Sequence, residues 1–455
     1  MKPRRALGSI LLTAGVLVSS PARADKPEDA ALEPEILVRS ETHFRLYQRA
    51  LLPGPYGAVV SEEVAAPVVE YASLSAHDLD AFGQKNSLDL ELDVWGSATF
   101  GEAGAGRRMD GDVQNANVRY RAGPGWVRLG RQHVAGGAAR YSRFDGLSAG
   151  GTLPMGLGAD AYAGLTVLPR WAARPGYHQL GSAVDTLARD VDALPEPNRA
   201  EHWVAGGRVY YDSPRLDVGA SVHEERDRGE LGHRNLGLDA RGDLSKKVSL
   251  GGTGVMDLDA TRVADARAWG HYVPIPEIQL EAEVLHAEPA LFLSRQSVLS
   301  VFSTDAYQEG GGSFRVKLWR ELSVTGSGFV QLYADDELGQ RGELGARITP
   351  GRTDRTVLIM TVSRVIAPEN GYRALRNAWR QRIALPLFAT VEAYHYLYDD
   401  PIRGYDSSSV YAGTLEWKFA RDLSLLWGSS FARTPYAASD AQTQLRLRYF
   451  SGGLQ

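Results

Sequence analysis

The chain contains no cysteine among its 455 residues. This absence excludes disulfide bonds, thiolate metal sites, iron–sulfur clusters and cysteine nucleophiles. Only 44% of the residues are apolar, and repeated apolar stretches of about 20 residues are missing, which excludes a bundle of membrane-spanning helices. The formal net charge is −5, and because nucleic-acid-binding domains carry a basic stripe, no nucleic-acid partner is expected. What remains is a large protein rich in glycine and tyrosine.

The first 24 residues have the pattern of a secretory signal peptide. Lys2, Arg4 and Arg5 form a charged start, residues 7–18 are mostly apolar, and Ala22-Arg23-Ala24 is a small-x-small cleavage site. We therefore predict a Sec-type signal that is cleaved after Ala24. A long secreted chain without cysteine fits the envelope of a Gram-negative bacterium better than a disulfide-stabilised extracellular protein.

Beyond the signal, the dominant hydrophobic pattern has a period of two residues. In Ser87–Thr99, Leu88, Leu90, Leu92 and Val94 alternate with acidic residues, so all four apolar side chains share one face of a strand. The same alternation recurs at 277–286, 322–334 and 443–450. Helical periodicity of comparable length does not occur.

The runs of this kind predict about twenty strands, within a range of 18 to 22. Short turns such as Gly123-Pro124-Gly125 and Asp212-Ser213-Pro214 alternate with longer segments such as 100–112, 169–202 and 224–234. Such alternation is typical of an up-and-down membrane barrel with tight turns at one end and long loops at the other. The predicted strands are 87–99, 113–121, 126–132, 144–151, 158–168, 203–211, 215–223, 235–242, 248–257, 262–272, 277–286, 307–319, 322–334, 341–348, 355–364, 377–385, 387–398, 409–417, 422–432 and 443–450.

We therefore predict an all-β fold, a transmembrane antiparallel up-and-down β-barrel over residues 87–450. Residues 1–24 are the signal peptide and 451–455 a short C-terminal tail. Residues 25–86 form a periplasmic segment or an extra hairpin, with candidate strands at 36–52 and 68–79. This stretch is too short to resemble the plug of an energy-coupled transporter. The sequence does not decide whether this segment or a loop blocks the lumen.

Tryptophan and tyrosine fall near the ends of many predicted strands, as in Trp95, Trp126 and Trp203. The amphipathic rings of these residues favour the headgroup level of a bilayer, whereas a stack of soluble sandwiches gives no reason for such placement. A β-propeller is disfavoured because no internal repeat of about 40–50 residues is visible. The segment Gln444–Phe450 resembles the last strand of outer-membrane barrels, although Ser451–Gln455 follow it.

Charged residues on a lipid face cost about 2–4 kcal/mol for Arg or Lys at the bilayer midplane, so the polar set is expected to line the lumen. The first predicted strand, 87–99, is acidic, and we expect it to lie between two strands with arginines, because strand 443–450 would close the barrel against it. Basic and acidic lanes elsewhere would create a transverse field across the pore. The residues predicted on this basis are Asp89, Glu91, Asp93, Arg119, Arg121, Glu277, Glu281, Glu283, Arg376, Arg380, Arg382, Arg446 and Arg448.

Residues 127–150 resemble a segment of alginate-export-type and other substrate-selective outer-membrane porins. The resemblance rests on Val127-Arg128-Leu129-Gly130-Arg131-Gln132, on Arg140, and on Phe144-Asp145-Gly146-Leu147. It implies a barrel that passes a solute, with Arg128, Arg131, Arg140 and Asp145 near the constriction of the pore. It does not extend to alginate as the solute.

Several short segments of the sequence partly match motifs of enzymes or metal sites. Gly146-Leu147-Ser148-Ala149-Gly150 matches the nucleophile elbow G-x-S-x-G, but no helix is predicted after it. His223–Asp227 lacks the second histidine of a zinc motif and is predicted to be a solvated loop tip. Acidic groups at 335–337 and at 399–406 lack the spacing of a calcium loop. We therefore predict no catalytic residue, no metal site and no cofactor.

The sequence thus predicts an outer-membrane channel, not an enzyme, that allows passive passage of small polar or charged solutes through a lumen lined by Arg and Asp/Glu. Its expected partners are outer-membrane lipid and the solute. A barrel hydrolase, an export conduit and a structural scaffold without an open pore remain as alternatives. The identity and charge of the solute and the oligomeric state are left open.

Overall fold

The computed structural model describes residues 35–51, 61–80, 86–101, 109–167, 201–227, 229–292, 306–334, 336–352, 355–368 and 370–451. The predicted signal peptide, residues 452–455 of the predicted tail 451–455, and nearly all of the predicted loop 169–202 lie outside the described residues, whereas Ser451 belongs to the last strand. Among the described residues, no helix is both long enough and apolar enough to cross a membrane.

The described residues form 22 β-strands and three short 3₁₀ helices. The strands are β1 (Glu35–Leu51), β2 (Ser61–Asp80), β3 (Asn86–Gly101), β4 (Met109–Ala122), β5 (Gly125–Gly136), β6 (Arg140–Thr152), β7 (Leu157–Thr166), β8 (Trp203–Asp212), β9 (Leu216–Asp227), β10 (Glu230–Ser245), β11 (Val248–Asp257), β12 (Arg262–Ile275), β13 (Ile278–Ala287), β14 (Tyr307–Trp319), β15 (Leu322–Tyr333), β16 (Leu338–Ile348), β17 (Thr356–Ile366), β18 (Tyr372–Ala384), β19 (Leu387–Ile402), β20 (Tyr405–Trp417), β21 (Leu423–Thr434) and β22 (Ala437–Ser451). The 3₁₀ helices are η1 (Gly137–Ala139), η7 (Pro289–Phe292) and η9 (Pro350–Arg352).

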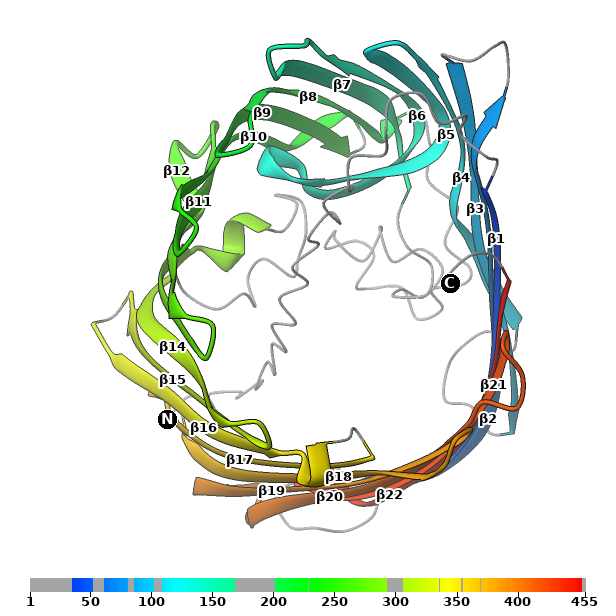
Figure 1. Ribbon diagram of the computed structural model, residues 1–455, viewed down its shortest axis with the longest axis vertical. Coiled ribbons are helices and arrows are strands. Elements are labelled where there is room, and N and C mark those ends of the chain that lie inside the picture. The colour runs from blue at the N-terminus through cyan, green and yellow to red at the C-terminus, as the bar shows by residue number, and fades with distance from the viewer. Residues whose placement is uncertain are drawn as a thin grey trace. The chain divides into compact units, whose positions relative to one another are not determined.

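Each strand pairs antiparallel with its neighbours in the chain, and β1 also pairs with β22, so the sheet closes on itself (Figure 1). A closed sheet leaves no edge strand with unpaired backbone groups, which is the condition for a strand-built protein to cross a bilayer. The predicted all-β antiparallel barrel is confirmed, and each of the twenty predicted strands corresponds to an observed one.

The two additional strands are β1 and β2, which lie in the stretch 25–86. They pair with each other and form part of the barrel wall, so the barrel begins at Glu35 and not at residue 87. The predicted closure of strand 443–450 against 87–99 is therefore wrong. The last strand, β22, pairs with β1, and two strands separate it from β3.

The connections at one end of the barrel are short, and at the other end several are long. The short end includes the turns at 123–124, 246–247 and 320–321, and we call it the short-turn end. Several connections predicted to be long are shorter than expected because the strands continue further. The predicted loop 224–234 is mostly strand, since β9 extends to Asp227 and β10 begins at Glu230.

Candidate functional site on the inner face of the barrel

The two faces of the sheet are distinguished by the hairpin of β5 and β6, whose cyan ribbon curves into the ring (Figure 1). Its tip, η1, contacts Ser221, Asn235 and Gly237 of the wall, so these residues lie on the inner face. Residues paired directly across neighbouring strands share a face, and the face alternates along each strand. The pairings therefore assign the inner and outer faces around the whole barrel.

The outer face carries exposed apolar side chains, among them Leu92, Leu129, Val209, Leu238 and Leu344. The inner face carries most of the charged residues of the strands, as the alternation in the sequence predicts. One exception is Glu70, which lies on the outer face beside Ser40 and Thr42. Both hydroxyls donate to its carboxylate, the Ser40 hydroxyl over 2.6 Å, so the charge is satisfied within the wall.

The β5–β6 hairpin leaves the wall at its tip. Pairing with β4 ends at Arg131 and pairing with β7 ends at Phe144, whereas β5 and β6 remain paired with each other as far as Gly136 and Arg140. At the departure point, Gly130 has φ +118°, and a Cβ there would lie 2.3 Å from the Ala116 carbonyl oxygen. Only glycine fits this conformation and this close approach.

The folded-over hairpin packs on the inner face through a small apolar core. Phe144 is 1% exposed and stacks on Tyr162 of β7 with ring centroids 5.5 Å apart. Ala139 and Val204 complete this core. Because an apolar surface is buried between hairpin and wall, the hairpin forms a second layer inside the barrel.

Two hydrogen bonds and one close backbone contact hold the tip. The Ala138 amide donates to the Ser221 hydroxyl at 2.8 Å, and the Asn235 side-chain amide donates to the Ala138 carbonyl at 3.2 Å. A Cβ on Gly237 would lie 2.3 Å from the Ala138 nitrogen, so glycine is required for this approach. The position of the tip is thus set by particular residues of β9 and β10.

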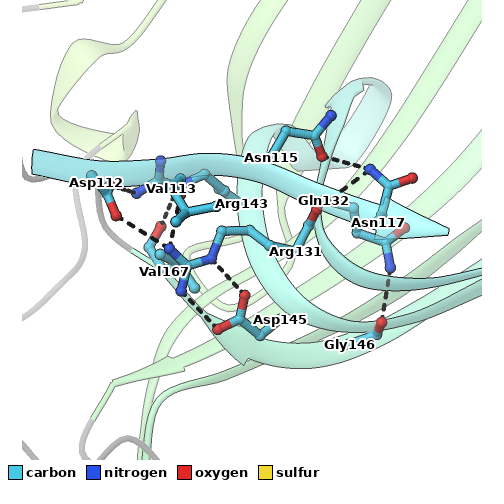
Figure 2. Close-up of polar contacts among 10 residues, drawn as sticks. All are labelled: Asp112, Val113, Asn115, Asn117, Arg131, Gln132, Arg143, Asp145, Gly146 and Val167. Atoms are coloured by element: carbon cyan, nitrogen blue, oxygen red, sulfur yellow. Dashed lines mark hydrogen bonds and ion pairs between the residues drawn. The ribbon is translucent and has the colours of Figure 1, made fainter. Parts of the chain in front are cut away.

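Figure 2 shows the ion-pair network at the base of the hairpin. Arg131 donates to both carboxylate oxygens of Asp145, at 2.7 and 3.0 Å, and to Asp112 of β4 at 3.2 Å. Arg143, which is 4% exposed, donates to the other oxygen of Asp112 at 2.7 Å. The network joins the hairpin to the inner face of β4 where regular strand pairing has ended. The sequence predicted Arg131 and Asp145 here but missed Asp112 and Arg143.

The acidic residues of β3 are matched by residues of β4. Asp89 is 2% exposed and accepts hydrogen bonds from Arg119 at 3.0 Å, Arg121 at 2.9 Å and the Asp78 amide at 3.1 Å. Glu91 accepts from the side-chain amides of Asn115 and Asn117. The strand with arginines expected beside 87–99 is therefore present on this side of β3, where its arginines pair with Asp89, whereas Glu91 is held by two neutral amides.

The seam between β1 and β22 holds a different acid from the predicted one. Arg446 and Arg448 lie 3.4 and 3.3 Å from the carboxylate of Glu41, not beside Asp89, Glu91 or Asp93. Arg39 donates to Glu41 at 3.0 Å, and His43 also contacts it. The seam is nevertheless an acid flanked by arginines, because β1 supplies the acid that was expected from β3.

The basic residues of β18 fall into two groups. Arg376 lies 3.4 Å from Glu392 of β19 and over the ring of Tyr394. Arg380 and Arg382 lie over the ring of Phe388, with guanidinium carbons 5.0 and 4.9 Å from its centroid. Lys418, beyond β20, lies over the same ring at 5.7 Å and was not predicted as a site residue.

The remaining predicted residues are dispersed. Arg128 lies on the inner face over Trp126, and Arg140 is in the hairpin at φ +54°. Asp93, Glu281 and Glu283 lie on the inner face, with Glu283 paired to Arg267 at 2.8 Å. Glu277 lies in the turn before β13, outside the strands, so it does not extend the acidic lane.

The structure shows where the segments that partly match enzyme and metal motifs lie. Ser148 of the G-x-S-x-G segment lies within β6 and donates to the side chain of Gln132. His223 is 4% exposed and bonds to the Tyr162 hydroxyl at 2.8 Å, so the prediction of a solvated loop tip is wrong. Among the described residues, no cluster of three or more His, Asp or Glu side chains could hold a metal ion.

No protein-family model matches the chain, and no curated protein sequence matches it. Among solved structures, the chain is similar to OccK2 (OpdF) of Pseudomonas aeruginosa in complex with glucuronate, with 12% identity over 93% of this chain and 97% of that one, at a TM-score of 0.45. It is also similar to the outer membrane protein opdK of Pseudomonas aeruginosa, with 9% identity, coverage of 92% and 99%, and a TM-score of 0.45. OccAB4 of Acinetobacter baumannii gives 7% identity, coverage of 92% and 98%, and a TM-score of 0.44.

Proposed function

We propose that the protein is an outer-membrane channel through which small polar or charged solutes pass by diffusion. The observation that carries the proposal is the division of the closed sheet into an apolar outer face and a charged inner face. Lipid tails accept the outer face, whereas arginines and carboxylates are stable only where water or opposite charges meet them. A water-filled lumen satisfies the inner face.

The β5–β6 hairpin is proposed to narrow this lumen from one side. Arg131 and Asp145 hold its base, Arg140 lies in its turn, and Arg128 precedes its departure from the wall. The sides of the pore would be lined by the acidic and basic residues of β3, β4, β13, β18 and β22. These are Asp89, Glu91, Asp93, Arg119, Arg121, Glu281, Glu283, Arg376, Arg380, Arg382, Arg446 and Arg448.

Both signs of charge occur on the inner face, and many of the charges are paired. A pore with paired charges of both signs orients a dipolar or charged solute without excluding either sign completely. We therefore propose a preference among small polar solutes and not strict selectivity for one ion. An outer-membrane location follows if the predicted signal peptide directs the chain into the envelope.

Planar-bilayer recording of the folded chain tests the proposal. We expect discrete, lasting single-channel current steps that increase linearly with salt concentration. Folding is checked beforehand by electrophoresis, since the closed barrel should migrate faster before heating in detergent than after it. A folded barrel that inserts into the bilayer and gives no current steps would contradict the channel function.

A further inference from the structure

One group of cations on the inner face has no acidic partner among the residues that the structure describes. Arg380, Arg382 and Lys418 gather within 6 Å of the ring of Phe388, with distances of 5.0, 4.9 and 5.7 Å to its centroid. Arg380 and Arg382 come from β18, and Lys418 comes from the turn after β20. All three lie toward the short-turn end, beside the β18–β19 turn at 385–386. We call these three residues with Phe388 the Phe388 cluster.

The charges of the Phe388 cluster are not balanced within the wall. Within the part of the chain that the structure describes, no carboxylate approaches any of the three cations to within 4.0 Å. The nearest acid by register is Glu416, directly opposite Phe388 on β20. Glu392, further along β19, is bound instead by Arg376 and Tyr394. Three cations and one unpaired carboxylate leave a local excess of two positive charges.

We propose that the Phe388 cluster binds a phosphate group. The reason for this ligand is the charge balance: a dianionic phosphate offsets two positive charges, whereas a carboxylate offsets one. Arginine also matches phosphate geometrically, because the guanidinium fork donates to two oxygens at once. Among the described residues, the buried Nε of Arg382 has no hydrogen-bond partner, so the hydrogen-bonding capacity of this guanidinium is not fully used within the wall.

The ring of Phe388 explains how the cations come together without a bound anion. The negative face of an aromatic ring attracts cations by about 0.5–1 kcal/mol each at exposed sites, which offsets part of their mutual repulsion. A bound phosphate would replace this partial compensation by direct ion pairs. The phosphate can belong to a solute in the lumen or to a lipid headgroup at the short-turn rim. Both present phosphate oxygens to the guanidinium forks, but only inorganic phosphate or a phosphomonoester is dianionic, whereas a lipid phosphodiester carries one negative charge, so the charge balance favours the solute.

Isothermal titration of inorganic phosphate into the folded chain in maltoside detergent tests the site. We expect saturable binding that weakens about tenfold or more in Arg380→Gln and in Arg382→Gln, because a hydrogen bond to a charged group is lost. Arg382→Lys keeps the charge without the fork and should lie between wild type and Arg382→Gln. Arg315→Gln, on the inner face of β14, is the matched control and should bind like wild type.

Binding that is absent in the folded wild type, or that weakens equally in Arg315→Gln, would overturn the proposal. Acetate binding as tightly as phosphate would overturn the argument from charge. To separate the two sources, the titration is repeated in nanodiscs of phosphatidylcholine and of phosphatidylglycerol. If inorganic phosphate binds more weakly in phosphatidylglycerol nanodiscs than in phosphatidylcholine nanodiscs, the lipid headgroup competes for the site. Equal binding of inorganic phosphate in both supports a free solute as the ligand.

The proposal depends on the inner-face assignment and on the lumen being accessible, and it deepens the proposed channel function. Its failure is distinguishable from the failure of that function. Phosphate binding through Arg380 and Arg382 without current steps would support the binding site and contradict the channel function. Current steps without phosphate binding would support the channel function and contradict the binding site.

Discussion

The inner face presents two contrasting regions, which we call the hairpin side and the Phe388 side. On the hairpin side, from β3 to β10, charges are buried and matched: Asp89 meets two arginines, and Asp112 meets two more at the base of the hairpin. On the Phe388 side, from β18 to β20, Arg380, Arg382 and Lys418 share one aromatic ring, and no carboxylate of the described chain pairs with them.

The difference separates charges that support the fold from charges available to a ligand. A buried ion pair that loses one partner leaves an uncompensated charge and costs about 3–5 kcal/mol. An exposed cation without a partner contributes little to stability, so its removal is expected to alter binding and conductance instead. The contrast is testable because all variants can be placed on one scale, the free energy of unfolding in detergent.

Removal of Asp89 on the hairpin side is expected to have the largest effect. Asp89→Asn leaves Arg119 without its carboxylate, whereas Arg121 keeps Asp78 at 2.7 Å, and both arginines are partly exposed, so we expect a loss of about 3 kcal/mol, at the lower end of the range for a broken buried pair. Urea unfolding followed by tryptophan fluorescence measures it. The control is Glu281→Gln, since Glu281 has no ion pair among the described residues; an equal loss in both variants would refute the contrast.

The docked hairpin tip is the second test. In Gly237→Ala, the new Cβ would lie 2.3 Å from the Ala138 nitrogen and 2.6 Å from the Ser221 hydroxyl. Overpacking of this kind costs about 1–3 kcal/mol, or the tip moves away and the lumen widens. We therefore expect lower stability together with a higher single-channel conductance.

Gly328→Ala is the matched control for this hairpin variant, because a Cβ at Gly328 has no heavy atom within 4 Å. It should change neither quantity. If Gly237→Ala left both stability and conductance at the wild-type values, the hairpin tip would not be held by this contact.

The twenty strands from β3 onward could be predicted because apolar side chains alternate with polar ones along most of their length, even though Glu224 and Arg364 lie on the outer face near strand ends. The strands β1 and β2 were predicted only as one alternative, an extra hairpin at 36–52 and 68–79 and not part of the barrel, because Glu70, Ser40 and Thr42 place polar groups on the outer face and interrupt the alternation. Their omission produced the wrong closure against β3. The predicted partners of Arg446 and Arg448 were therefore also wrong, since Glu41 of β1 and not an acid of β3 lies beside them.

The candidate site was predictable only where partners lie on neighbouring strands. Asp89 and Arg119 face each other directly across β3 and β4, so strand order alone brings them together. The resemblance of residues 127–150 implied residues near a constriction of the pore but not that the hairpin folds inward. The predicted strands 126–132 and 144–151 end near the residues where wall pairing stops. Lys418 joins the Phe388 cluster from a turn, where no alternation marks the direction of a side chain.

On the Phe388 side, Glu392→Gln probes the ion pair between Glu392 and Arg376. Arg376 lies 3.4 Å from Glu392, and both side chains are substantially exposed, so the pair contributes about 0–1 kcal/mol. We expect a loss of about 0.5 kcal/mol and a shift of the reversal potential toward anions, because Arg376 becomes unmatched. A double-mutant cycle with Arg376→Gln isolates the pair, and a coupling above about 2 kcal/mol would place it with the hairpin side.

The smallest change in stability is expected for Arg380→Gln. Its cation–π contact with Phe388 is worth about 0.5–1 kcal/mol, and relief of repulsion from Arg382 and Lys418 acts in the opposite direction. The two effects should nearly cancel, whereas the reversal potential in a salt gradient should shift toward cations because one unmatched positive charge is gone. A loss of stability as large as that of Asp89→Asn would show that Arg380 supports the fold. A shift in selectivity without a loss of stability would show that Arg380 is available to a ligand and does not stabilise the barrel wall.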